Sequence, residues 1–204
     1  MVLLKSIFGA LVTLATFTTG FANVVEKAQA DVNQNGVVGS FVFTPDAKGV
    51  KVDISIKEGL NDTFMYHVHE KQITGTNCTT AGGHLDPAKV GVVAANYKCN
   101  PADLSTCEVG DLTGKWGTLN TTTPSFSYVD PTLSLEDHGA NNSVVGLSVV
   151  IHRMDQTKTR IACANILNAK ASSQDDKKPG SSGVQLQVGG WLTVAALMVG
   201  SVAL

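Results

Sequence analysis

The sequence has little charge and contains no run of lysine or arginine residues. Only 16% of its 204 residues are charged, and the formal net charge is -2. A protein that binds nucleic acid or another polyanion carries a strongly basic patch, so this composition argues against nucleic acid as a partner. The length and the 43% hydrophobic content fit one globular domain after processing.

The sequence also lacks an apolar run of the length that crosses a membrane, which is about 20 residues. The N-terminal apolar stretch, residues 6–19, is short and is interrupted by threonines. It follows a positive charge at Lys5 and precedes small residues that end at Ala22. This pattern is typical of a secretory signal peptide, so we expect residues 1–22 to be removed by cleavage after Ala22. An uncleaved membrane anchor is the alternative interpretation.

The C-terminal apolar stretch, residues 191–204, is likewise too short to span a bilayer comfortably. A mixed spacer precedes it, and before that spacer lie four small residues, Gly180, Ser181, Ser182 and Gly183. Small residues, a spacer and a short apolar tail are the pattern of glycosylphosphatidylinositol (GPI) attachment. We therefore expect residues 173–183 to form a linker containing the attachment residue and residues 184–204 to be a removed propeptide. A tail-anchored helix is the alternative.

Between these ends, residues 23–172 are sufficient for one well-buried core. This segment contains four glycosylation sequons, which begin at Asn61, Asn77, Asn120 and Asn141. Sequons fit an extracellular protein. Together with the expected GPI anchor, they predict a secreted protein that is attached to the plasma membrane or the cell wall. We expect a monomer, because an anchor and glycans would crowd the surface.

No C-x-x-C spacing occurs, which argues against cysteine as a metal ligand. The four cysteines, Cys78, Cys99, Cys107 and Cys163, form an even set that predicts two disulfides in an oxidising compartment. Three connectivities are possible. The short separation of Cys99 and Cys107 favours a local loop closure between them, which leaves Cys78 with Cys163 as a long-range pair.

Helical periodicity is weak throughout the domain, whereas alternation of apolar and polar residues is frequent. It is clearest in the predicted strand at residues 50–57, where Val50, Val52, Ile54 and Ile56 would share one face. Further strands are predicted at residues 63–70, 144–152 and 160–167, with weaker candidates at 37–43 and 126–133. Several short strands around one core predict an antiparallel sandwich or barrel. The long irregular stretch at residues 71–107 is unusual for a compact domain and indicates a functional segment.

Four of the five histidines form a pattern that can bind a metal ion. His67 and His69 lie two residues apart on a predicted strand, so their side chains would point to the same side. His84 follows two glycines and His152 ends the apolar run at residues 149–151, whereas His138 stands apart in a turn-like setting. An all-imidazole set suits copper or, less specifically, zinc, and the spacing alone does not choose between them.

Five sequence pieces in register resemble the copper/zinc superoxide dismutases. They are His67-Val68-His69-Glu70, the stretch from Cys78 to Pro87 containing Gly82-Gly83-His84, Val109-Gly110-Asp111-Leu112, Val149-Val150-Ile151-His152 and Arg160-Ile161-Ala162-Cys163. The resemblance implies an all-β fold, a Greek-key antiparallel β-sandwich or barrel of eight strands. It also implies copper bound by His67, His69, His84 and His152, an active-site arginine at Arg160 and a disulfide cysteine at Cys163.

The departures from this family indicate a centre without zinc. The family's third copper histidine bridges to zinc, but of the expected zinc ligands only His84 and Asp111 are present, and Glu108 stands where a zinc histidine is expected. Residues 153–159 also replace the family's long electrostatic loop. These features resemble the extracellular copper-only superoxide dismutases of fungi, so we expect one copper ion, no zinc and superoxide as substrate.

The resemblance also suggests roles for individual residues. His84 would carry a proton, Glu108 would orient its far nitrogen, and Asp111 would hold the loop. Arg160 would pair with the superoxide anion through its permanent charge. A copper-buffering or copper-sensing surface protein would need the histidines but not Arg160, and a structural wall protein would need neither. A zinc-containing enzyme with unusual ligands is a minor alternative.

Overall fold

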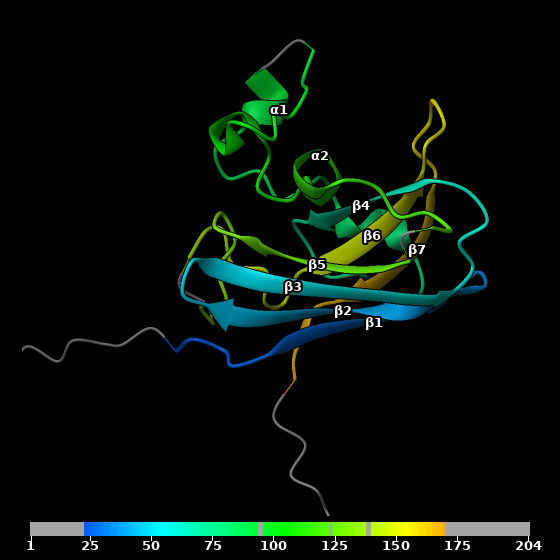
Figure 1. The fold of residues 1–204 in the computed structure, drawn as a ribbon, viewed down its shortest axis with the longest axis horizontal. Coiled ribbons are helices and arrows are strands. Elements are labelled where there is room, and N and C mark those ends of the chain that lie inside the picture. Colours follow the sequence, from blue (N-terminus) through cyan, green and yellow to red (C-terminus); the bar gives the residue numbers. More distant parts are fainter. Residues whose placement is uncertain (1–22, 94–95, 123, 138–139, 170–204) are drawn as a thin grey trace, which may run out of the picture. The chain divides into compact units, whose positions relative to one another are not determined.

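Two antiparallel sheets dominate the part of the chain that the computed structural model describes, residues 23–93, 96–122, 124–137 and 140–169. One sheet has the strand order β5-β3-β2-β1-β8 and the other has the order β4-β6-β7, and Figure 1 shows the strands of the two sheets. The strands are β1 (Ala28–Gln34), β2 (Val37–Asp46), β3 (Gly49–Glu58), β4 (Phe64–His69), β5 (Ser125–Asp130), β6 (Ser148–Arg153), β7 (Arg160–Asn165) and β8 (Leu167–Asn168). The predicted all-β antiparallel sandwich is confirmed.

The alternation of apolar and polar residues that predicts β3 corresponds to the two faces of the strand, one buried in the core and one facing solvent. Val50, Val52, Ile54 and Ile56 are buried, whereas Lys51 is exposed. The buried side chains meet apolar residues of both sheets, including Phe41, Phe43, Phe64, Tyr66, Val149 and Ile151. Burial of this apolar face is the main free-energy term that holds the two sheets together.

The β1 strand is not among the strands predicted from sequence. Its buried residues, Ala28, Ala30 and Val32, alternate with polar ones, but alanine is a poor strand former and the signal is weak. A better signal follows the strand. Asn35 and Gly36 both have positive φ, 49° and 81°, as a two-residue type I′ hairpin turn requires. The Asn-Gly pair therefore indicates the β1–β2 hairpin, whereas the residues of the strand alone do not.

Two predicted strands are shorter in the structure. The strand expected at residues 144–152 begins only at Ser148, because Leu147 N–H bonds to Val144 O in a turn where Gly146 has φ 78°. The strand expected at residues 160–167 is divided into β7 and the start of β8, with Ile166 between them.

The connection from β4 to β5 contains the predicted irregular stretch, and its described residues form four short helices. These are the 3-10 helices η1 (Cys78–Ala81) and η2 (Leu104–Thr106) and the α-helices α1 (Val90–Val93) and α2 (Leu112–Trp116). The α2 helix packs on β4 (Figure 1). None of the described helices has the length and apolar character needed to cross a membrane.

Disulfides join the long connection both to the sheet and to itself. Cys78 pairs with Cys163 on β7, across 85 positions in the sequence. Cys99 pairs with Cys107, across 8 positions. The structure thus contains the pairing that the cysteine spacing favours. Residues 1–22, His138 and the expected attachment residues 180–183 lie outside the described residues.

Candidate metal centre

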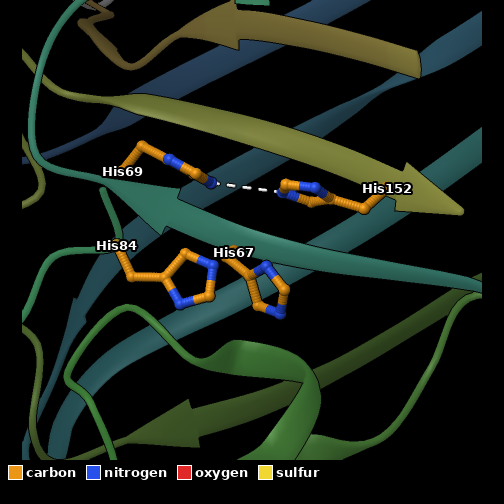
Figure 2. A group of neighbouring side chains, drawn as sticks. All are labelled: His67, His69, His84 and His152. Atoms are coloured by element: carbon orange, nitrogen blue, oxygen red, sulfur yellow. Dashed lines mark hydrogen bonds between the residues drawn. The ribbon is translucent and has the colours of Figure 1, made fainter. Parts of the chain in front are cut away.

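Four histidine side chains converge on one face of the three-stranded sheet. His67 and His69 come from β4, His152 from β6 and His84 from the long connection (Figure 2). One ring nitrogen of each lies within 4.8 Å of the corresponding nitrogen of every other member. His67, His69 and His152 are buried, and His84 is partly exposed.

Strand pairing places three of these side chains on one face. In the antiparallel pair β4–β6, His152 lies opposite Met65, and residues directly opposite each other share a face of the sheet. Met65, His67 and His69 are two residues apart along β4, so they share that face as well. The opposite face of β4 presents Phe64, Tyr66 and Val68 to the hydrophobic core.

The edge of β4 also positions the loop residues. Leu85 N–H donates to Val68 O, and Val68 N–H donates to Gly110 O, both at 2.9 Å. These bonds place His84 and Glu108 beside the strand from segments far apart in the sequence. Gly110 approaches so closely that a Cβ there would lie 2.2 Å from Val68 O, which explains the need for glycine in this motif.

Hydrogen bonds to backbone carbonyls fix the protonation of two histidines. Nδ1 of His69 bonds to Gly82 O at 3.1 Å, and Nδ1 of His152 bonds to Lys158 O at 2.9 Å. Because a carbonyl only accepts, each Nδ1 must carry the proton, and each Nε2 then has a free lone pair. The two Nε2 atoms face each other at 3.2 Å (Figure 2). Two opposed lone pairs repel unless a cation lies between them.

Burial keeps the sheet histidines neutral. Desolvation is the largest cause that lowers the pKa of His69 to about 3 and of His152 to about 4, with the neighbouring His84 contributing in each case. The pKa of His67 is also well below its usual value, for the same reason. Its Nδ1 is buried without a hydrogen-bond partner among the described residues. Neutral imidazoles with unshared lone pairs are the form that binds metal ions.

His84 differs from the other histidines because a side chain holds its far nitrogen. Its Nδ1 contacts the carboxylate of Glu108 through Oε2. This contact leaves Nε2 free to face the other imidazoles. The structure thus brings together His84 and Glu108, which the sequence predicts to be paired. A hydrogen bond of this kind orients metal-bound imidazoles.

Asp111 lies on the loop side of the centre and fastens α2. One carboxylate oxygen, Oδ1, accepts from Gly114 N–H at 2.8 Å as an N-cap, and Oδ2 accepts from the Tyr97 hydroxyl at 2.8 Å. The same Oδ1 lies 3.5 Å from Nε2 of His67. These contacts join Asp111 to α2 and to Tyr97 and bring it beside His67.

Arg160 at the start of β7 ties the centre to the disulfide loop. Its guanidinium donates to Cys78 O at 2.7 Å and to Gly82 O at 2.6 Å. Gly82 O thus accepts from both Arg160 and His69. Arg160 also lines a cavity of about 580 Å³ together with His84 and Glu108, so its charge faces the solvent side of the centre.

The four glycosylation candidates differ in exposure. Asn61, Asn77 and Asn141 are exposed, and Asn120 is partly buried. Asn77 is the N-cap of η1, and its Oδ1 accepts from Thr79 N–H at 3.0 Å.

Two residues of this centre, Tyr97 and Lys158, are not predicted from sequence. Tyr97 lies in an irregular stretch without periodicity, so no local pattern distinguishes it. Lys158 acts through its backbone carbonyl, which any residue type possesses. The one local signal is the dense set of hydrogen bonds to Asp155, whose carboxylate accepts from the Thr159 amide and hydroxyl and shapes the turn at Lys158.

Four convergent histidines on an antiparallel β-sandwich are the arrangement that the sequence resemblance to the copper/zinc superoxide dismutases implies. Residues 37–189 match the profile of that family, described as copper/zinc superoxide dismutase (SODC), and the chain belongs to it.

Several relatives are proteins of the fungal cell surface. Cell surface superoxide dismutase [Cu-Zn] 6 of Candida albicans is 38% identical over 65% of this chain and 41% of its own length. Cell surface Cu-only superoxide dismutase 5 of the same organism is 32% identical over 75% of this chain and 64% of its own length. The chain therefore spans less than two thirds of either relative.

Among solved structures, superoxide dismutase 5 of Candida albicans with Cu(II) superimposes with a TM-score of 0.61. The two are 30% identical, and the match covers 74% of this chain and 97% of the other.

Proposed function

We propose that this chain is an extracellular superoxide dismutase that uses one copper ion and no zinc. The observation that carries the proposal is the pair of unprotonated Nε2 atoms of His69 and His152, which face each other at 3.2 Å in a buried site. The residues that would hold copper are His67, His69, His84 and His152. Family membership and the Cu-only name of one relative support copper over other metals.

Bound copper supplies one-electron chemistry, which turns two superoxide ions and two protons into one dioxygen and one hydrogen peroxide. The protein residues divide the remaining work. His67, His69 and His152 hold fixed positions because they lie on buried strands. His84 and Glu108 form the pair through which a proton reaches the reduced substrate, since Nδ1 of His84 bonds to a group that can itself carry a proton.

Arg160 binds the superoxide anion at the mouth of the centre. Two donors of its guanidinium hold the loop carbonyls of Cys78 and Gly82, which fixes the group in place. Its remaining donors and its permanent positive charge are available for the anion. Asp111 acts indirectly, because its hydrogen bond with Gly114 helps to hold the loop that contains Glu108 in position.

A single metal follows from the surroundings of His84. In the family, the far nitrogen of this histidine faces zinc, whereas here it contacts Glu108. A closed zinc site takes four N, S or O ligands, and the expected second and third zinc histidines are missing from the sequence. Zinc is therefore not part of the proposed centre.

The two ends of the chain would determine its processing and location. Residues 1–22 would be a signal peptide, residues 23–172 the enzyme domain and residues 184–204 a propeptide lost on GPI attachment within residues 180–183. The enzyme would be a glycosylated monomer held at the plasma membrane or cell wall. The cell-surface names of its relatives support this location.

Metal loading with an activity assay tests the function. Secreted protein spanning residues 23–172 would be stripped of metal, offered copper, zinc or both, and assayed for metal content and superoxide removal. We expect one copper, no zinc and rapid superoxide removal. One copper without activity would favour the copper-buffering function, and one copper with one zinc would contradict the single-metal centre.

A further inference from the structure

Glu108 is held by contacts that the proposed reaction does not itself require. Its backbone N–H donates to the Tyr97 hydroxyl at 2.9 Å, and that hydroxyl donates to Asp111 Oδ2 at 2.8 Å. One phenol thus joins the backbone of one acidic residue to the side chain of another. Because the hydroxyl both accepts and donates, it fixes Glu108 relative to the N-cap of α2.

The carboxylate of Glu108 is confined from the other side by α1. A Cβ built on Gly91 would lie 1.8 Å from Oε1 of Glu108, so any side chain at this position would displace the carboxylate. Asp86 holds this segment in place, since its two carboxylate oxygens accept from Val90 N–H at 3.0 Å and Gly91 N–H at 2.9 Å.

The outer side of α1 makes no comparable contact. Val92 and Val93 are each 79% exposed, so the helix contributes no side chain to the hydrophobic core. On its inner side, the backbone at Gly91 lies against the carboxylate of Glu108. Two of its three valines lie outside the core, so packing of apolar side chains contributes little to holding this short helix in place.

The Cys99–Cys107 disulfide brings the two halves of this arrangement together. Tyr97 lies two positions before Cys99, and Glu108 directly follows Cys107. The covalent link therefore places the phenol beside the amide to which it bonds. Without the link, this contact would have to be held by an irregular loop alone.

We propose that Asp86, Gly91 and Tyr97 form a clamp that sets the carboxylate of Glu108 against Nδ1 of His84. Tyr97 and Gly91 are positioning residues, and this role rests on the proposed proton transfer through Glu108 and His84. Tyr97 fixes the backbone of Glu108. Gly91 limits the carboxylate to the side that faces the histidine.

Two substitutions test the clamp by opposite means. Tyr97→Phe keeps the ring but removes both hydrogen bonds, and Gly91→Ala pushes a methyl group into the space of Oε1. Tyr128→Phe is the matched control, because it removes a phenol oxygen that bonds to Tyr66 away from the four histidines. Glu108→Gln is the reference for loss of the carboxylate itself.

The full copper-loaded proteins would be compared by three measurements. Copper content and thermal unfolding establish that each variant is folded and loaded. The proton resonance of His84 Nδ1, recorded in the diamagnetic Cu(I) form, reports the contact with Glu108 directly. Pulse radiolysis gives the rate of superoxide removal and its solvent deuterium isotope effect.

We expect both clamp variants to keep copper while the His84 Nδ1 resonance shifts or broadens. Their rates should fall about threefold to tenfold, the cost of one misaligned hydrogen bond, with a changed isotope effect. Tyr128→Phe should match the wild type. If Glu108→Gln alters the resonance and rate but both clamp variants match the wild type, the clamp alone is overturned. If Glu108→Gln changes neither, its proton-transfer role is overturned and the clamp with it.

Discussion

Two histidines of the sheet, His69 and His152, and the loop histidine His84 are held by different chemistry. On the sheet side, His69 and His152 donate from Nδ1 to backbone carbonyls of Gly82 and Lys158. On the loop side, Nδ1 of His84 contacts the carboxylate of Glu108. A backbone carbonyl does not take up a proton near neutral pH, whereas a carboxylate is a group that can carry one.

This difference assigns separate tasks to the two sides. A histidine bonded to a carbonyl keeps one tautomer and one orientation, which favours steady metal binding. A histidine bonded to a carboxylate can take up and release a proton without moving its backbone. In the proposed enzyme, the sheet therefore retains the metal and the loop delivers the proton.

Replacing one ligand from each side should have the largest effect and should separate these tasks. His152→Ala removes a buried sheet ligand, so we expect copper affinity to fall by more than about 100-fold and activity to be lost. His84→Ala should retain copper within about 10-fold of the wild-type affinity while losing activity. Competition with a chelator of known affinity measures both constants. Equal copper loss in the two variants would remove the distinction between the two sides.

The two disulfides should differ in their contributions to stability. Cys78–Cys163 closes a separation of 85 positions and Cys99–Cys107 a separation of 8. By loop-closure entropy, removing the first pair by serine substitution should cost roughly 4 to 5 kcal/mol and removing the second roughly 2 to 3 kcal/mol. Urea unfolding of the copper-free variants measures both. A larger loss for the short loop would show that native contacts outweigh chain entropy here.

Replacing Arg160 tests whether the superoxide anion is bound where the sheet side and the loop side meet. Arg160→Ala should reduce the rate of superoxide removal by about 10- to 100-fold, because a charge-assisted hydrogen bond is lost, while copper remains bound. Arg153→Ala is the matched control, since Arg153 is exposed on the neighbouring strand. Equal rate losses in the two variants would show that Arg160 acts through general surface charge and not by binding the anion.

Acid should weaken the sheet side through a smaller, graded effect in the copper-free protein. Burial holds the pKa of His69 at about 3 and of His152 at about 4, whereas histidine in an unfolded chain titrates near 6.5. Below about pH 6.5 the unfolded chain binds more protons, so stability should fall as the pH drops toward 4 and 3. Urea midpoints across this range measure the trend. A midpoint that stays constant would contradict the buried neutral state.

The sequence predicts the sheet side better than the loop side. Strand alternation identifies β3 and β4, and the two-residue spacing of His67 and His69 is enough to place their side chains on one face. His152 follows from the apolar run that precedes it. Strand geometry is regular, so residue spacing translates directly into direction.

The loop side depends on contacts that spacing does not encode. Glu108 is identified only because it stands where zinc-containing members of the family have a histidine, and Tyr97 and Gly91 are not identified at all. Their positions follow from a disulfide, a capped turn and the close approach of Gly91 to a carboxylate. Such contacts arise from the path of an irregular chain, to which no periodicity applies.

The most direct test of the division between the two sides is the rate of superoxide removal by Glu108→Gln at matched copper content, from about pH 6 to about pH 9. The substitution keeps the shape of the side chain but removes its ability to carry a proton. We predict full copper retention and a rate at least about tenfold below wild type, with a deficit that grows as solvent protons become scarce. A rate equal to the wild type at every pH would contradict the account.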